Sequence, residues 1–202
     1  HWLSKGGVWK LDSQLIGSQA DDRFGLGLAS DLVYTPQKGR VHNFALDLLD
    51  RQIDINDFGF LRRNDIAQLR YRYEETRSDL SHVRDRTTTL RGFYGWNWQG
   101  QQISSGIIAQ REWTLLNLSR ARVELGYRPP RWDDRNSFGN GAFKTKGRTT
   151  GEFFLGTNES LPLVGGIFGG FEQETLQDWS YSGGVFVVWR PGDRFNARMR
   201  MQ

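Results

Sequence analysis

Apolar and polar residues alternate over segments of about ten residues, and this period of two constrains the fold more than any other feature of the chain. In one segment Leu69 and Tyr71 alternate with Arg70 and Arg72. Such alternation predicts β-strands with one apolar and one polar face. The apolar face would form the core of a soluble sandwich, whereas in a membrane barrel it would face lipid.

Turn-forming residues divide the chain into about 10 or 11 predicted strands, each antiparallel to its neighbours. The predicted strands are 8–19, 24–35, 41–52, 66–77, 88–99, 102–113, 117–127, 148–157, 163–173, 179–189 and 194–201. Segments 53–65, 78–85 and 128–147 are predicted to be loops, and the third is rich in Gly, Pro and polar residues. The sequence therefore predicts an all-β protein.

Composition excludes several classes of protein. The chain has no Cys, which rules out disulfides and thiolate chemistry. Its net charge of +4 is modest and both signs are interleaved, so we expect no nucleic-acid partner. It has no apolar run of about 18 residues, so transmembrane helices are excluded. Membrane-spanning strands remain compatible with the sequence, because each needs only about 9–11 residues.

Two features favour lipid over a buried core. The predicted strands exceed the usual 5–6 residues of globular proteins and approach the length that crosses a bilayer. Aromatic residues also gather near their ends, where membrane barrels carry interfacial girdles. These aromatic residues are Trp9, Tyr34, Trp96, Trp98, Trp113, Tyr127, Trp179, Tyr181 and Trp189. A soluble antiparallel sandwich with a solvated outer face is the alternative.

Charged residues occupy the face opposite the large apolar side chains. The candidates for a polar lumen are Asp47, Arg70, Arg72, Arg91, Arg120, Arg122, Glu124 and Glu152. They could line a path for anionic or sugar-like solutes. They could equally form an internal network of salt bridges that fills a narrow barrel. The even mixture of opposite charges favours the network.

The first long loop contains oxygen-bearing side chains. Asp54, Asn56 and Asp57 are candidates for loop contacts and could offer hard oxygen ligands to Ca²⁺. However, their spacing does not complete an EF-hand, because the loop lacks the required Gly and the terminal Glu. We therefore expect Asp and Asn to cap and turn the backbone here, and we predict no metal site.

The second long loop places two carboxylates beside an aromatic ring, at Trp132, Asp133 and Asp134. Sugar-binding sites use this combination, so these residues are also candidates for loop contacts. Adjacent carboxylates do not form a catalytic pair, because the two groups must flank a bond at a separation of about 5–9 Å. We interpret them as solvated loop charge. The sequence offers no catalytic constellation and no phosphate-binding loop, so we predict no catalytic residue and no cofactor.

Three stretches together resemble a known family. They are "QIDINDFGFLRRND" after "HNFALDLLD", "RWDDRNSFGNGAFKTKGRTTGEFFLGTNESLPL", and "VVWRPGDRFNARMRMQ". The family is a bacterial outer-membrane group in which a carbohydrate-binding-family-9-like domain precedes a C-terminal β-barrel of uncharacterised function. The resemblance runs from about Leu15 to Gln202, although the family's usual Arg-Gly-Gly-Pro appears here as Ser-Phe-Gly-Asn-Gly. The resemblance implies a Gram-negative outer-membrane location. It also implies that this chain lacks the family's N-terminal carbohydrate-binding-like domain.

We therefore expect residues 1–202 to form one antiparallel transmembrane β-barrel domain of the outer-membrane type. The chain ends in "RMRMQ" instead of an aromatic residue, so we expect it to be part of a larger barrel. The expected role is non-enzymatic, as a porin-like channel with a polar lumen or as a membrane anchor. Expected partners are the lipid bilayer and lipopolysaccharide, with a sugar or an anionic solute as candidate cargo.

Three other functions stay open from the sequence alone. The barrel could be a subunit that docks onto a larger envelope or secretion complex through a protein partner. The chain could instead be a soluble β-sandwich that binds carbohydrate. An outer-membrane hydrolase would need a carboxylate or Ser/His site, for which the sequence offers no candidate.

Overall fold

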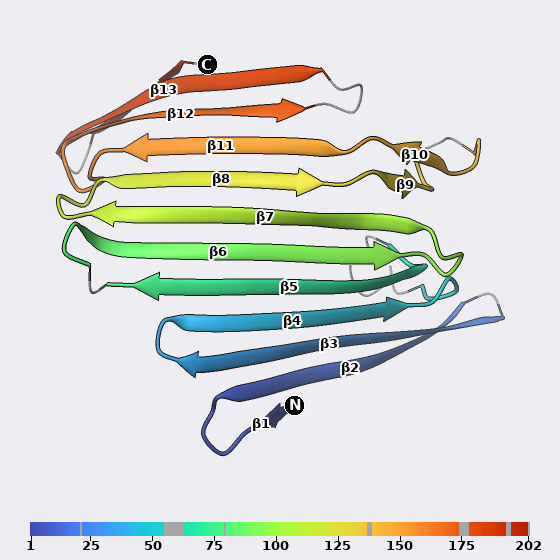
Figure 1. Ribbon diagram of the computed structural model, residues 1–202. Helices are drawn as coiled ribbons and strands as arrows, with labels where there is room; N and C mark the ends of the chain where they lie inside the picture. The colour runs from blue at the N-terminus through green and yellow to red at the C-terminus, as the bar shows by residue number, and fades with distance from the viewer. Residues whose placement is uncertain are drawn as a thin grey trace. The chain divides into compact units, whose positions relative to one another are not determined.

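The computed structural model is all-β and describes residues 1–20, 22–54, 63–78, 80–136, 139–173, 178–192 and 195–201 (Figure 1). Its main sheet is antiparallel and has 12 strands in the order β1-β2-β3-β4-β5-β6-β7-β8-β11-β12-β13-β14, while β9 and β10 form a separate pair. The strands are β1 (Trp2–Leu3), β2 (Trp9–Ala20), β3 (Arg23–Gln37), β4 (Arg40–Leu49), β5 (Ile66–Arg77), β6 (Val83–Trp96), β7 (Gln102–Leu115), β8 (Arg120–Arg128), β9 (Arg131–Asp133), β10 (Phe143–Thr145), β11 (Arg148–Gly156), β12 (Leu163–Gln173), β13 (Trp179–Gly192) and β14 (Phe195–Met201). Neighbours in sequence are neighbours in the sheet, except where the β9–β10 hairpin intervenes between β8 and β11.

The main strands follow the sequence prediction closely, with several corrections, among them that β6 ends at Trp96 and not at 99. Strand β4 ends at Leu49 and not at 52, and β6 already begins at Val83 inside the predicted loop 78–85. The predicted loop 128–147 contains the β9–β10 hairpin, and the two-residue β1 was not predicted. Backbone pairing explains the added strand residues, because ladder hydrogen bonds hold polar segments extended even where their side chains show little alternation. The chain leaves β4 early because Ile53 packs against Gly25 and Gly27.

The described chain divides into two compact units. Unit 1 comprises residues 1–73, 91–107 and 129–145, and unit 2 comprises residues 74–90, 108–128 and 146–202. The prediction of a single domain over residues 1–202 stays a prediction. No helix in the described part of the chain is long and apolar enough to cross a membrane.

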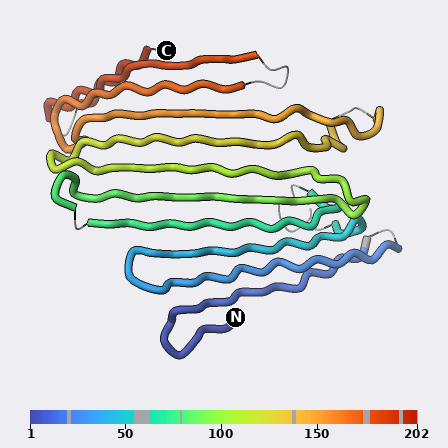
Figure 2. The backbone as a smooth tube through the Cα atoms, in the orientation of Figure 1, coloured from blue at the N-terminus to red at the C-terminus, as the bar shows by residue number. Residues whose placement is uncertain are grey.

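Strand register in unit 1 confirms the predicted faces. Leu32 of β3 lies opposite Leu11 of β2 and Phe44 of β4, so these side chains share one face. The next row, on the other face, places Asp31 of β3 between Asp12 and Ala45. Figure 2 traces the backbone through these hairpins, in which each strand returns beside the one before it. The period-two pattern of the sequence is therefore the pattern of the sheet.

Two glycines of β3 allow the chain after β4 to pack onto the polar face of unit 1. A Cβ at Gly25 would overlap the backbone of Ile53, and a Cβ at Gly27 would lie 2.8 Å from the Ile53 Cδ1 atom. Ile53 is only 1% exposed as a result. Asp54 extends this contact, since its backbone N–H donates to the Ser18 hydroxyl at 2.9 Å. The two glycines of β3, which lack side chains, therefore leave the space in which the chain after β4 packs.

Glycines in unit 2 lie beneath phenyl rings of the neighbouring strand. Phe168 of β12 is the direct partner of Gly184 in β13, and Phe186 of β13 is the direct partner of Gly166 in β12. In both pairs a Cβ on the glycine would overlap the ring of its partner. An aromatic ring covering a cross-strand glycine restores contact area that the missing side chain would otherwise lose.

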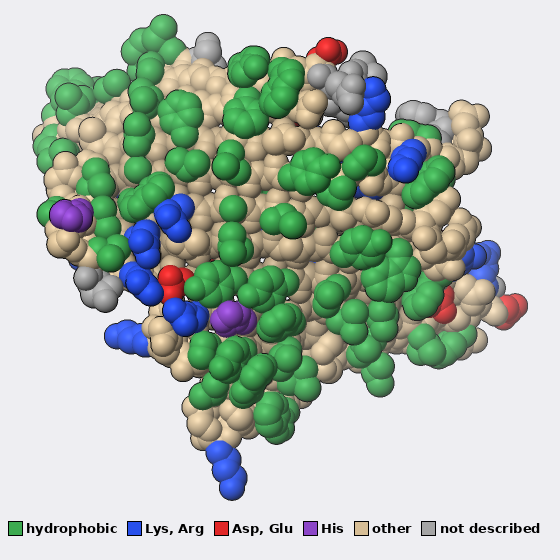
Figure 3. Space-filling view, viewed as in Figure 1, with side chains coloured by type: hydrophobic (Ala, Val, Ile, Leu, Met, Phe, Trp, Pro, Cys, Tyr) green, Lys and Arg blue, Asp and Glu red, His purple; other side chains and the backbone are tan. Residues whose placement is uncertain are grey.

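Large apolar side chains are exposed along one face of each unit. In unit 1, Leu15 is 82% exposed and Leu26 54%, and in unit 2 Leu155 and Ile167 are 47% and 44% exposed. Figure 3 shows hydrophobic side chains over much of the face in view, with Lys, Arg, Asp and Glu mainly toward its margins. The buried apolar side chains of the described chain are fewer and are all aliphatic: Ala45, Ile53, Ile66, Ala67, Ile103, Val164 and Val188.

Candidate functional site

The polar face of unit 2 contains a cavity of about 1010 Å³. Four arginines line it, Arg122, Arg190, Arg198 and Arg200, together with Glu152 and Glu159. Phe154, Phe168 and Phe186 contribute phenyl rings to the same lining. We call this site the arginine-phenylalanine cavity.

Strand register explains why these residues meet. Arg122 of β8 lies opposite Phe154 of β11, and Phe154 lies opposite Phe168 of β12. At the other side, Arg200 of β14 lies opposite Phe186 of β13. Direct cross-strand partners share a face, so the rings form a floor on β11, β12 and β13 between arginines on β8 and β14.

Ring and cation contacts order part of this floor. The guanidinium carbon of Arg200 lies 4.7 Å from the centre of the Phe168 ring. The rings of Phe154 and Phe186 are stacked with their centres 5.9 Å apart. A cation over a ring face and an offset ring stack are both attractive arrangements. These contacts hold the rings of the floor in a defined arrangement.

The arginines of the cavity are unequally engaged. Arg190 donates from Nη1 to the backbone carbonyl of Glu159 at 3.3 Å, and the Glu159 carboxylate pairs with Arg120 at 3.5 Å. Among the described residues, Arg122 and Arg198 form no hydrogen bond or ion pair. Both side chains are exposed. With four arginines against two glutamates, the lining carries an excess of positive charge.

The predicted lumen residues divide between the two units. In unit 1, Arg70 Nη2 lies 2.7 Å from Asp47 Oδ2, an ion pair of the kind that the predicted network requires. Arg72 is exposed and Arg91 is half-buried on their strands. In unit 2, Glu124 and Glu152 are direct cross-strand partners, so two like charges face each other there. The predicted set thus contains an ion pair in unit 1 and two like charges in direct register in unit 2.

Sequence reasoning missed Arg190, Arg198 and Arg200, and also the three rings of the floor. The segment "RFNARMRM" was predicted as the strand 194–201, but the alternation of Arg198 and Arg200 with Met199 and Met201 was not used to assign the arginines to a face. That alternation was a sufficient signal for their placement on one face. The rings were harder to find, because glycines of their own strands, as in "GGIFGGF" and "GGVF", interrupt the alternation around Phe168 and Phe186.

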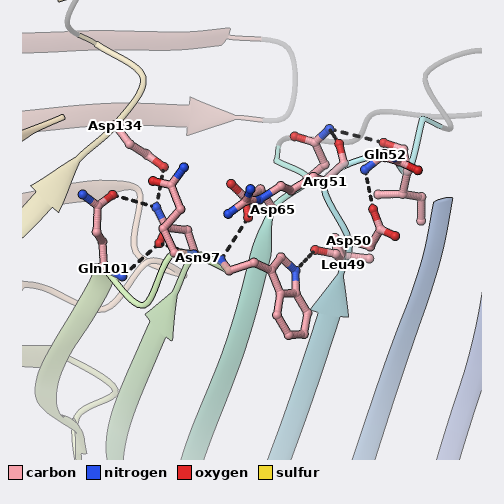
Figure 4. A network of polar contacts seen from close by, with 12 residues as sticks. Leu49, Asp50, Arg51, Gln52, Asp65, Asn97, Gln101 and Asp134 are labelled. Carbon is pink, nitrogen blue, oxygen red and sulfur yellow. Dashed lines mark hydrogen bonds and ion pairs between the residues drawn. The ribbon is translucent and has the colours of Figure 1, made fainter. Parts of the chain in front are cut away.

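A second polar site joins loop segments in unit 1. Arg63 donates from Nη1 to Asp134 Oδ1 at 2.9 Å and from Nη2 to Oδ2 at 2.5 Å, which is a bidentate pair. Asn97 donates from Nδ2 to the same carboxylate at 3.2 Å (Figure 4). Asp134 and Arg63 are mostly buried, with side chains 16% and 21% exposed. We call this group the Asp134 clamp.

The turn after β6 is tied to the same clamp. Asn97, which is 1% exposed, accepts the backbone N–H of Gln101 at 2.9 Å and donates to the Gln101 side chain at 2.9 Å. Trp98, predicted as a strand residue, lies in this turn, where its indole N–H donates to the Leu49 carbonyl at 2.8 Å. Its backbone N–H donates to Asp65 at 3.0 Å. The turn therefore bridges the end of β4 and the start of β5.

Electrostatics in the second loop differ from the predicted solvated charge. Partial burial raises the pKa of Asp134, but hydrogen bonds from Arg63 and Asn97 outweigh it, so the pKa lies below the ordinary value. Burial also raises the pKa of Asp133, and hydrogen bonds from Asn136 and Arg135 lower it further than burial raises it. Interpretation of Asp134 as solvated loop charge was therefore wrong, because its charge is held by an arginine 71 residues away.

The remaining loop candidates are only partly described. Trp132 is half-buried in β9, beside Asp133, whose carboxylate accepts the backbone N–H groups of Arg135 and Asn136 at 3.1 and 3.0 Å. These bonds cap a turn, a role that was predicted for Asp and Asn of the first loop and not for Asp133. Asn56 and Asp57 lie outside the residues that the structure describes.

No family model, curated protein or solved structure matches this chain. The resemblance carried by its sequence motifs therefore stays a prediction. Function has to be inferred from the faces of the sheet and from the two sites.

Within the described ranges, no group of three or more His, Asp or Glu side chains is placed to hold a metal ion. The absence of a cofactor stays a prediction as well. Chemically, the arginine-phenylalanine cavity can bind negative charge next to an apolar surface. The Asp134 clamp has its charges mutually satisfied, so its chemistry is that of a structural tie.

Proposed function

We propose that this chain forms a transmembrane β-barrel of the bacterial outer membrane and acts without catalysis, as a channel with a polar lumen or as a membrane anchor. The proposal places the exposed apolar face against lipid and the charged face toward the lumen. It agrees with the family that the sequence motifs resemble. The excess of arginine in the cavity favours the channel, because a pure anchor has no need for an unbalanced interior charge.

The observation that carries this proposal is the exposure of large apolar side chains in the middle of strands. Soluble monomers rarely leave wide contiguous apolar patches open to water. Here Leu15 is the most exposed large apolar side chain of β2, while its neighbour Gln14 belongs to the opposite, polar face. A lipid environment makes the exposed face favourable, since burial of apolar area stabilises by about 25 cal/mol per Å².

Aromatic side chains at one end of the strands of unit 1 support the same orientation. Trp9 and Tyr34 stack with their ring centres 4.1 Å apart. The ring centres of His42 and Tyr73 are 5.1 Å apart. These residues lie near the start of β2 and β4 and near the end of β3 and β5. Amphipathic rings in such a row suit the membrane interface, where one side is apolar and the other is hydrated.

Single-cysteine labelling would test which face meets lipid, because the chain contains no Cys of its own. L15C and Q14C differ by one position and place an environment-sensitive fluorophore on opposite faces of β2. In lipid vesicles we expect nitroxide-labelled lipid to quench the label at Leu15, and aqueous iodide to quench the label at Gln14. Equal quenching by iodide at both positions would contradict the proposal.

Gel mobility gives a second, independent test of a closed membrane barrel. The full chain, extracted from outer membranes in mild detergent, should migrate faster before boiling than after it, because a closed barrel resists unfolding by the gel detergent. The Q14C variant should show the same difference in mobility, which would verify that the labelled protein assembles correctly. A chain that is soluble without detergent and shows no shift would favour the carbohydrate-binding sandwich.

A further inference from the structure

We propose that the arginine-phenylalanine cavity of unit 2 binds an organic anion, namely a phosphate or carboxylate joined to a flat apolar body. This inference deepens the proposed function by naming a solute class, and it rests on that function only for its biological setting. The cavity itself lies within one unit and is lined by described residues. Its ability to bind such a compound can therefore be measured without a membrane.

The charge of the lining selects for an anion. Arg122 and Arg198 have no hydrogen-bonding or ionic partner among the described residues, and both line the cavity. A guanidinium group can bind carboxylate or phosphate through two parallel hydrogen bonds. Glu152 and Glu159 line the same cavity, so a cation would have a place too, but the four arginines outnumber them.

The floor of the cavity selects for an apolar body. Phe154 and Phe186 present a stacked pair, and Phe168 lies beneath Arg200. Val164 and Val188, both 3% exposed, complete the apolar surface beside Arg198. A small inorganic anion would leave these rings uncovered, whereas a compound with a ring or chain would cover them while its acid reaches the arginines.

The volume fits a small organic compound. About 1010 Å³ lies at the upper end of the range of about 300–1,000 Å³ that is usual for small-molecule sites. Such sites combine mostly apolar walls with a few polar groups that fix orientation. The cavity combines apolar and polar surface in similar proportion, with rings on the central strands and arginines on β8, β13 and β14.

Calorimetric titration of the full chain in detergent tests this inference with three probes. The probe 2-naphthyl phosphate carries both the acid and the ring, 2-naphthol carries only the ring system, and inorganic phosphate carries only the acid. We expect 2-naphthyl phosphate to bind at least about tenfold more tightly than either of the other two, because it alone contacts both arginines and rings. Equal affinity for 2-naphthyl phosphate and either single-feature probe would overturn the inference.

The double variant R122Q/R198Q locates the site. It should weaken 2-naphthyl phosphate binding by about tenfold or more, since charge-assisted hydrogen bonds are lost. The matched control is R128Q, which lies on the same strand and the same face as Arg122 but outside the cavity. Because all three side chains are exposed, these changes should leave folding intact, which unchanged gel mobility and circular dichroism would verify. An equal loss in R128Q, or no loss in R122Q/R198Q, would refute the assignment.

Failure of this inference is distinguishable from failure of the proposed function. A heat-modifiable band with no preference for 2-naphthyl phosphate would remove the solute class and leave the membrane barrel. If the chain prefers 2-naphthyl phosphate but shows no gel shift, the solute site is supported and the membrane barrel is contradicted. F154L provides a further check on the ring floor, because it should weaken binding of 2-naphthyl phosphate while sparing that of inorganic phosphate.

Discussion

At the scale of single residues, Asp134 ties together three segments of unit 1 that are distant in sequence. It receives two hydrogen bonds from Arg63 and one from Asn97, so its charge is compensated although it is mostly buried. Removing one member of such a group leaves the others without a partner, which costs more than the contact itself contributes.

We expect D134N to lower the free energy of unfolding by about 1–3 kcal/mol, because Arg63 loses its carboxylate in a poorly hydrated place. Urea denaturation followed by tryptophan fluorescence would measure this change. D178N is the control, since Asp178 is exposed and has no polar partner among the described residues. Equal stability of the two variants would show that the clamp contributes nothing.

The pH dependence of the same variant follows from the lowered pKa of Asp134 in the folded chain. A carboxyl group with a depressed folded pKa contributes stability above its unfolded pKa of about 3.9, and loses it as the pH falls through the folded pKa. The stability difference between the natural chain and D134N should therefore be constant above about pH 5 and shrink below about pH 4. A difference that grows on acidification would contradict this sign.

Gly25 is the residue whose lack of a side chain most directly affects packing. A Cβ there would meet the backbone of Ile53, which has little freedom to move because it is fully buried. We expect G25A to reduce the free energy of unfolding by about 1–3 kcal/mol through overpacking. G92A in β6 is the control, because nothing lies within 4 Å of a Cβ at Gly92. Denaturation midpoints that fall equally in both variants would rule out the close contact as the cause.

At the scale of elements, the β7–β8 hairpin contains a turn with local strain. Leu118 has a φ of 65°, which lies in the left-handed region that residues other than Gly, Asn and Asp rarely occupy. The turn nevertheless closes, because the Leu118 N–H donates to the Leu115 carbonyl at 2.9 Å and the Asn117 side chain accepts the Ser119 N–H at 3.0 Å. Strand pairing on both sides therefore imposes a conformation that the residue itself disfavours.

We expect L118N to raise the free energy of unfolding by about 0.5–1 kcal/mol, because Asn tolerates the left-handed conformation better than Leu does. L116N is the matched control, since Leu116 belongs to the same turn and its φ is not positive. The same denaturation assay serves both variants. A gain in L116N as large as that in L118N would attribute the effect to lost surface hydrophobicity instead of backbone strain.

At the scale of the whole molecule, the proposed channel can be separated from the proposed anchor by conductance. In planar bilayers with a KCl gradient we expect stepwise conductance and a reversal potential that favours chloride, since four arginines face two glutamates in the cavity lining. The variant R122E/R198E should shift the reversal potential toward potassium. A reconstituted chain that inserts but never conducts would leave the anchor as its role.

Local sequence pattern determined most of the sheet. Strands, antiparallel neighbours and the two faces follow from a period of two and from turn residues, because side-chain direction in a strand depends only on position along it. The ion pair between Asp47 and Arg70 lies on the face where alternation placed it. Barrel closure, location and function remain proposals.

Tertiary structure alone decided which distant residues meet. The contact of Asp134 with Arg63 spans 71 residues, and the packing of Ile53 on Gly25 depends on how a loop returns to its sheet. The arginine-phenylalanine cavity likewise needs the register of five strands to bring Arg122 and Arg200 to one site. Periodicity gives the direction of each side chain, but pairing between strands and the path of loops set the distances between them, and those distances create the sites.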